Sequence, residues 1–148
     1  MYKKILIATD GSKFASAAID HGVKLAARVE ASVVFVTVTE MWSAFHMAEN
    51  LQDGVPNPVE AYVASTKESA QKILAEAKAV ADAASVVSQS VHVSNSSPAE
   101  GIIETAEKHE CDLIVMASHG RRGLGRMLLG SQTSEVLGFA TLPVLVLR

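Results

Sequence analysis

The stretch KILIATDGS, residues 4–12, sets the start of the fold. Ile5 to Ala8 is apolar without alternation, which is typical of a strand buried on both faces of a parallel sheet. The residues that follow, Thr9 to Ser12, favour a turn, and the Ser12 hydroxyl is suited to cap a helix. We therefore expect a strand, a short turn and a helix in this order.

The same order of strand and helix repeats to the end of the chain. Asn57-Pro58 and Ser97-Pro98 each place a capping residue before a proline, and Glu60 completes a capping box after the first pair. The expected strands are residues 5–8, 32–39, 86–93, 113–117 and 143–147; the expected helices begin at residues 12, 57, 97 and 131, and the second and last reach residues 84 and 140. This alternation predicts an α/β fold, a single doubly wound domain with a five-stranded parallel sheet in the order 3-2-1-4-5 and helices on both faces.

Length, charge and cysteine content restrict the class of protein. The 148 residues suit one domain, residues 1–148, and the net charge of −3 disfavours partners such as nucleic acid or an anionic membrane. No apolar run is as long as a membrane span or as the core of a signal peptide. The single cysteine, Cys111, excludes an internal disulfide and suits a reducing compartment. We expect a soluble, cytoplasmic protein.

Two strand ends carry the polar residues that could form a site. Doubly wound sheets bind ligands beyond the carboxyl ends of their strands, where the winding reverses. The turn after strand one and the loop that begins at Ser118 would flank one crevice there. Two interpretations of Asp10 stay open: it binds ribose hydroxyls or a metal through water, or it is a turn residue before the first helix.

The loop after strand four has the composition of an anion site. It contains three arginines and no acid, and its glycines, Gly120 among them, allow positive φ or a close backbone approach. Gly130-Ser131 then opens a helix whose free N–H groups favour a phosphate, and the Ser131 and Thr133 hydroxyls add donors. The alternative is a tight turn with a solvated basic face.

Catalytic and metal motifs are missing from the sequence. There is no P-loop, no GxGxxG directly after a strand, no Ser-His-Asp set or carboxylate pair, and no metal-ligand spacing among the five histidines. His119 has no visible orienting partner, so we expect no catalytic residue and no metal ligand. Cys111 is expected to be a small buried residue. The segment 41–56 either covers a site or is a surface excursion.

At this point the sequence resembles the universal stress protein family along essentially its whole length. Residues 4–12 resemble the first strand and turn of that family, residues 112–123 its fourth strand and loop, and residues 128–131 and 143–146 its ending. The nucleotide-binding branch of the family carries the pattern G-x2-G-x9-G-[ST]. The matching positions here are Ala117, Gly120, Gly130 and Ser131, so the spacing is intact and alanine replaces the first glycine.

The resemblance implies a set of nucleotide-binding residues. Ala8, Thr9 and Asp10 would line the base and ribose, and the Val38 backbone would meet the adenine edge. Gly130, Ser131, Gln132 and Thr133 would hold phosphates, although Gln132 stands where an apolar residue is common in that branch. Met116, Ala117, Gly120 and Arg121 complete the expected nucleotide-binding set. The Ala117 methyl group would crowd the ligand if the backbone had to approach it closely.

Three functions follow from the resemblance. The first is a nucleotide-binding stress-response protein that acts as a binder or sensor, with ATP, with or without Mg²⁺ or Mn²⁺, or another adenine nucleotide as ligand. The second is a slow ATP hydrolase, which the lack of an evident general base disfavours. The third is a stress protein that acts only through protein partners. The resemblance also implies a homodimer through the C-terminal strand, whose exposed edge pairing would cover.

Overall fold

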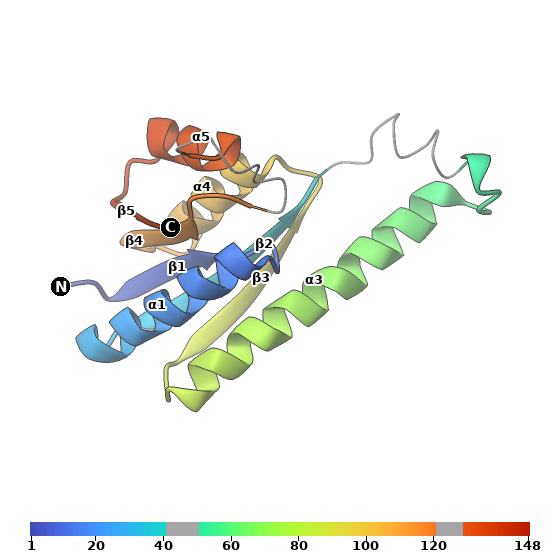
Figure 1. The fold of residues 1–148 in the computed structure, drawn as a ribbon. Coiled ribbons are helices and arrows are strands. Elements are labelled where there is room, and N and C mark those ends of the chain that lie inside the picture. Colours follow the sequence, from blue (N-terminus) through green and yellow to red (C-terminus); the bar gives the residue numbers. More distant parts are fainter. Residues whose placement is uncertain (41–50, 121–128) are drawn as a thin grey trace.

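A five-stranded parallel sheet in the order β3-β2-β1-β4-β5 forms the centre of the molecule (Figure 1). The computed structural model describes residues 1–40, 51–120 and 129–148. The strands are β1 Lys4–Ala8, β2 Ser32–Thr39, β3 Ser88–Ser94, β4 Leu113–Ala117 and β5 Val144–Leu147, and the helices are α1 Lys13–Val29, α3 Pro58–Ala83, α4 Pro98–Lys108 and α5 Ser131–Phe139. The doubly wound fold and the strand order predicted from the sequence are confirmed.

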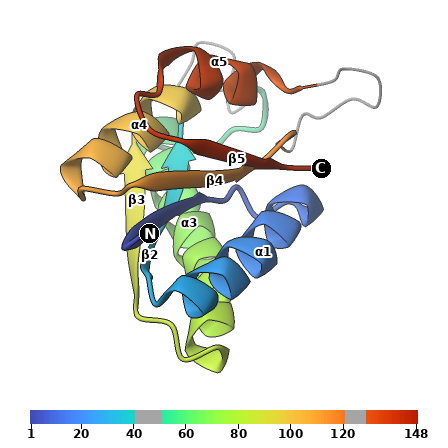
Figure 2. The same cartoon turned by 90° about the vertical axis from the view of Figure 1, so that its left-hand side faces the viewer.

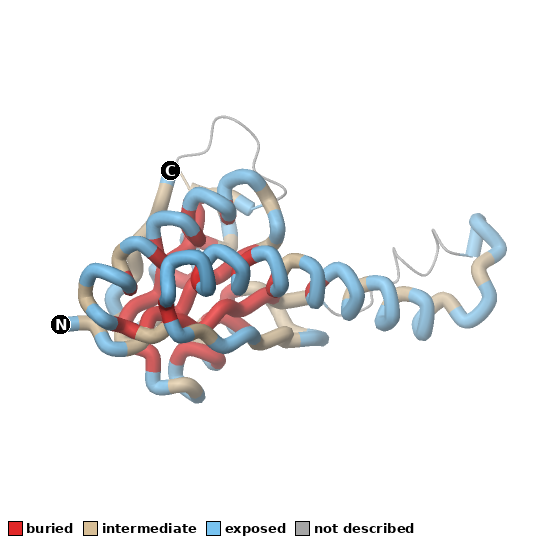
Figure 3. Tube along the Cα trace, turned by 90° about the horizontal axis from the view of Figure 1, so that it is seen from below, coloured by how far each residue is buried: buried red, intermediate tan, exposed pale blue. Residues whose placement is uncertain are grey.

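Helices cover both faces of the sheet, α1 and α3 one face and α4 and α5 the other (Figure 2). Successive side chains of β1 alternate between the two cores: Ile5 and Ile7 pack under α1 and α3, and Leu6 and Ala8 under α4 and α5. Because both faces are buried, residues 5–8 of β1 and all of β4 are apolar, as the sequence predicted. The N-terminal half of α3 extends beyond the sheet and is mostly exposed (Figure 3).

The helix starts agree with the sequence in position and differ in chemistry. The Ser12 hydroxyl caps α1 by accepting from the Ala15 N–H at 3.2 Å, as expected. Asn57 and Ser97 precede proline as expected, but neither side chain makes a capping hydrogen bond. Asn57 instead adopts a left-handed conformation with φ of 49°, which turns its side chain away from the N-cap geometry. The two capping predictions are therefore wrong, while the helix positions are right.

Three further predictions concern Cys111, the third strand and the segment 41–56. Cys111 is 5% exposed and free, and burial raises the pKa of its thiol to about 11. The third strand is shifted, since it runs over Ser88–Ser94 where residues 86–93 were expected. Most of the segment 41–56 lies outside the described residues, so its two interpretations stay predictions.

Candidate functional site

The carboxyl ends of β1 and β4 lie side by side, as the sequence predicted. The two strands are parallel neighbours, with Ile7 opposite Val115. The loops that follow them are in contact: a Cβ atom added to Gly120 would lie 2.8 Å from Oδ2 of Asp10. The lack of a side chain at Gly120 therefore allows the two loops to approach closely. The φ of Gly120 is not positive, since among the described glycines only Gly11 and Gly54 have positive φ.

Hydrogen bonds inside the first loop fix the position of Asp10. Its Oδ1 accepts from the Ser12 N–H at 2.9 Å, and the Thr9 hydroxyl accepts from the Gly11 N–H at 3.3 Å. Gly11 turns the chain with φ of 78°, which favours glycine. Asp10 thus has the turn role that the sequence left open, and its second oxygen faces the loop after β4.

The start of α5 is held against the end of β4. The Gly130 N–H donates to the Ser118 carbonyl at 2.8 Å, and the Thr133 hydroxyl, 3% exposed, donates to the carbonyls of Ala117 and Ser118 at 3.0 and 3.1 Å. A Cβ atom on Gly130 would lie 3.2 Å from the Ser118 carbonyl oxygen. A side chain larger than hydrogen is therefore crowded at the first residue of this helix start.

At the N-terminus of α5 the first backbone N–H groups point out of the helix. Gly130 is the N-cap residue, and within the described part of the chain no side chain caps α5. The N–H groups of the first helical residues have no partner within an α-helix, and they form the positive end of its dipole. The Thr133 hydroxyl hydrogen is already committed to β4, so the donors at this place are mainly backbone N–H groups.

Gln132 has a structural contact that sequence reasoning missed. Its Oε1 accepts from the Ala99 N–H at 2.9 Å, which places this side chain on the first turn of α4. It supplies there the capping bond that Ser97 does not make. This explains a polar residue at a position where the family resemblance implied an apolar one.

The apolar residues of the expected site lie at the strand ends and divide between the two faces. Ala8 and Met116 belong to the core under α4 and α5, whereas the Ala117 methyl group packs into the core on the α1 side. Val38 lies beyond the last β1–β2 pair, Ala8 opposite Val36. Its side chain packs against α4, since a Cβ on Gly101 would lie 2.8 Å from Val38 Cγ2.

His119 lies in the loop after β4 and contacts this loop and the start of α1. Its Nδ1 is 3.1 Å from the Ser118 hydroxyl, and its ring centroid is 6.2 Å from that of Phe14 in the first turn of α1. Among the described residues, no group of three His, Cys, Asp or Glu side chains could hold a metal ion. Arg121 and the rest of the basic loop, 121–128, lie outside the described residues.

The fold and this site define a class: single-domain α/β proteins with a candidate anion-binding helix start at the switch point of the sheet. The model of the universal stress protein family matches residues 1–148, and this chain belongs to that family. It is 36% identical over 152 residues to the universal stress protein MJ0531 of Methanocaldococcus jannaschii, covering 100% of this chain and 83% of that protein.

Solved structures agree with the family. The structure of MJ0577, a protein whose biochemical function was assigned from its structure, superposes with a TM-score of 0.81 at 28% identity, covering 99% of this chain and 96% of that one. A universal stress protein solved in complex with cAMP matches with a TM-score of 0.68 at 24% identity, covering 99% of this chain and 97% of that one. The second likeness shows the shared fold.

None of the described helices has the length and apolar character needed to cross a membrane.

Proposed function

We propose that this universal stress protein binds an adenine nucleotide, with ATP as the first candidate, and acts as a binder or sensor. The observation that carries the proposal is the start of α5, which no described side chain caps and which is held against the loop after β4 that contacts Asp10. Free N–H groups at a helix start are a good binding site for phosphate oxygens. The cAMP complex of a protein with this fold supports an adenine nucleotide in particular.

Each group of residues has a role in this proposal. The backbone of Gly130, Ser131, Gln132 and Thr133 donates to the phosphates, and the Ser131 hydroxyl adds a donor. Ala8, Thr9, Asp10 and the Val38 backbone line the base and ribose, and Met116, Ala117 and Gly120 form the adjoining wall. Arg121 adds positive charge near the phosphates. Mg²⁺ or Mn²⁺ would be carried by the phosphates, with Asp10 contacting it through water.

The alanine in the glycine pattern is compatible with this proposal. The Ala117 methyl group points into the core on the α1 side. The side of β4 toward α4 and α5 is instead formed by Met116. The methyl group therefore does not occupy the space beside the α5 start, and the alanine does not oppose the ATP-binding-type branch.

The edge of the sheet supports a homodimer as a second part of the proposal. β5 is the last strand of the sheet, and all four of its residues are partly exposed. A second copy that pairs along this edge would cover the backbone groups and apolar side chains that the strand exposes. The free buried Cys111 agrees with a cytoplasmic location.

Titration of nucleotide-stripped protein with ATP and Mg²⁺ by calorimetry tests the binding proposal. We expect micromolar affinity in the parent and no measurable binding in Gly130→Val, because the new side chain would meet the Ser118 carbonyl and block the phosphate approach. Gly138→Val is the matched control, since a Cβ at Gly138 meets nothing within 4 Å. Circular dichroism shows whether both variants fold.

Each outcome has a distinct meaning. Binding that survives in a folded Gly130→Val protein rules out the α5 start as the site. No binding in the parent up to millimolar ATP favours a stress protein that acts only through protein partners. Steady phosphate release after binding identifies a slow hydrolase instead of a sensor.

A further inference from the structure

A second feature lies on the α4–α5 face of the molecule, on the outer side of the two helices. A groove of about 360 Å³ runs between them. Ala99, Ile103 and Phe139 form its apolar lining, and Glu100, Glu104 and Glu135 lie along it. The three glutamates are exposed.

The charge of this face is mainly negative. α4 and α5 together contain Glu100, Glu104, Glu107, Glu135 and one cation, Lys108, so they carry a net charge of −3, equal to that of the whole chain. Among the residues that the structure describes, no Lys or Arg lines the groove. Charges of one sign on a concave surface attract ligands of the opposite sign and repel anions.

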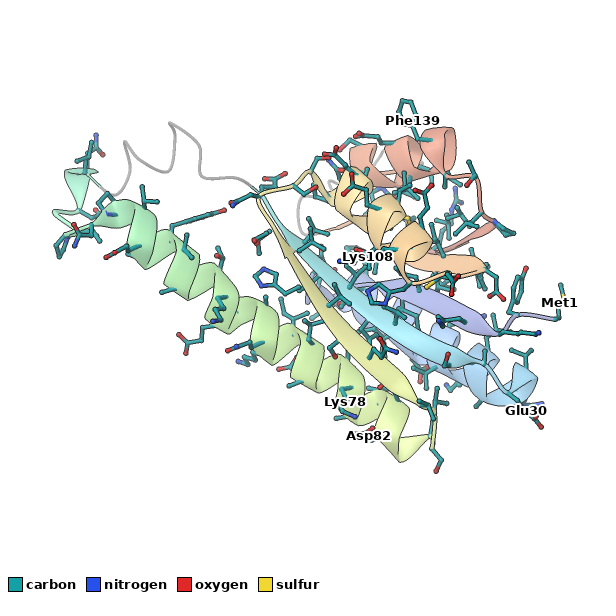
Figure 4. The ribbon with its side chains drawn as sticks, turned by 180° about the vertical axis from the view of Figure 1, so that it is seen from behind. Met1, Glu30, Lys78, Asp82, Lys108 and Phe139 are labelled. Carbon is teal, nitrogen blue, oxygen red and sulfur yellow. The ribbon has the colours of Figure 1, made fainter. Side chains whose placement is uncertain are left out.

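The groove also exposes a large aromatic side chain. Phe139 is 73% exposed at the end of α5, and its side chain is directed away from the sheet (Figure 4). The neighbouring Leu137 is 43% exposed. Apolar side chains rimmed by charges are typical of surfaces that bind another protein, and aromatic residues are enriched at the centre of such interfaces.

Both walls of the groove are fixed to the body of the protein. Val136 is fully buried and anchors α5, while Ala99, also fully buried, anchors α4. The Gln132–Ala99 hydrogen bond joins the first turns of the two helices. A preformed groove binds a partner without the cost of ordering its own walls.

We infer that the α4–α5 groove is a docking surface for a basic, amphipathic segment of another protein. Lysine or arginine side chains of the segment pair with Glu100, Glu104 and Glu135, and an apolar side chain packs on Phe139 and Ile103.

Charge complementarity favours this occupant over α3 of a second copy. α3 also exposes apolar side chains, such as Val59 and Val63, but it contains three lysines and four acidic residues. It is therefore not a basic segment that would complement the groove. Arg121, Arg122 and Arg126 of a second copy are the alternative basic occupant, which the measurement without peptide detects.

Nuclear magnetic resonance of the isotope-labelled full chain tests this inference. The probe is a synthetic peptide of lysine and leucine with the leucines at helical spacing, and the matched peptide replaces each lysine by glutamate. We expect the lysine peptide to shift the backbone amide signals of α4 and α5, and the glutamate peptide to shift none of them. The affinity should fall with added salt, because exposed ion pairs are screened.

Charge-matched variants separate docking from general attraction. Glu104→Lys should weaken lysine-peptide binding at least about tenfold, whereas Glu68→Lys, which makes the same change of net charge on the exposed face of α3, should leave it nearly unchanged. Phe139→Ser should weaken binding, and Val87→Ser, at another exposed apolar residue, should not.

Three results would overturn the inference. The first is equal weakening by Glu104→Lys and Glu68→Lys. The second is a set of shifted signals outside α4 and α5, or no shift at all. The third is concentration-dependent shifts of the groove signals without peptide, which would assign the groove to a second copy of this chain.

Discussion

The helices that begin at the carboxyl edge of the sheet satisfy their first N–H groups in three different ways. α1 is capped by its own Ser12, α4 by Gln132 from a helix that follows it in sequence, and α5 by no side chain of the described residues. All three starts belong to the same small domain. α3 also lacks a side-chain cap, but its start lies beyond the end of the sheet. The start of α5 lies against the end of β4, where such sheets bind ligands, so a ligand as partner of its N–H groups agrees with the nucleotide proposal.

The loop contact opposite the uncapped helix gives the largest effect after Gly130→Val. Gly120→Ala would place a methyl group 2.8 Å from Oδ2 of Asp10, so this carboxylate has to turn away. Because the carboxylate is the far end of a side chain that can rotate, we expect Gly120→Ala to cause only a small loss of stability. Asp10→Ala should weaken nucleotide binding by about 1–3 kcal/mol, as for a lost hydrogen bond to a charged group, and Gly120→Ala should act in the same direction.

Calorimetric titration of both variants with ATP measures this effect, and thermal unfolding provides the check on folding. Parent-like affinity in both would show that Asp10 is only the turn residue that its bond to Ser12 already makes it. The comparison would then depend on the α5 start alone.

The anchoring of α5 is the next contact to break. In Thr133→Val the hydroxyl that donates to Ala117 and Ser118 is lost at a buried position, with almost no change of shape. The Ser118 carbonyl keeps the bond from the Gly130 N–H, so the loss falls mainly on the Ala117 carbonyl. An unsatisfied buried carbonyl costs about 1–3 kcal/mol, and the free energy of unfolding should fall by that amount. Urea unfolding measures it.

Thr105→Val is the matched control. The Thr105 hydroxyl is equally buried, but it donates to the Gly101 carbonyl within α4, which the hydrogen-bond ladder of the helix also serves. We expect a smaller loss there. Equal losses of unfolding free energy in the two variants would mean that the bonds from Thr133 stabilise the protein no more than a hydroxyl bond within a helix.

Local signals in the sequence predicted most of the fold. The apolar strands, the Ser12 cap and the prolines at helix starts depend on neighbouring residues, so they can be recognised without the structure. The pairing of β1 with β4 followed from the alternation of strands and helices. These features place the two loops of the candidate site together.

Contacts between distant residues could not be predicted in the same way. The Gln132 bond to Ala99 joins residues 33 positions apart, and no local pattern marks it. The glycine pattern indicated Gly120 as a site residue, but the reason, the space that Asp10 needs, requires both loops in place. Family resemblance named the position and the structure supplied the cause.

Removing the side-chain caps of α1 and α4 should have the smallest effect on ATP affinity, and it tests the comparison between capped and uncapped helix starts directly. Ser12→Ala and Gln132→Ala each remove one capping bond, at α1 and α4, and each should lower the free energy of unfolding by about 0.5–2 kcal/mol. Urea unfolding measures both. Neither side chain is needed as a phosphate donor, because the donors at the α5 start are backbone groups, so ATP affinity should stay near that of the parent. If Gln132→Ala instead lost affinity at unchanged stability, its amide would be a ligand to the phosphates, and the separation of capped from uncapped helix starts would fail at this residue.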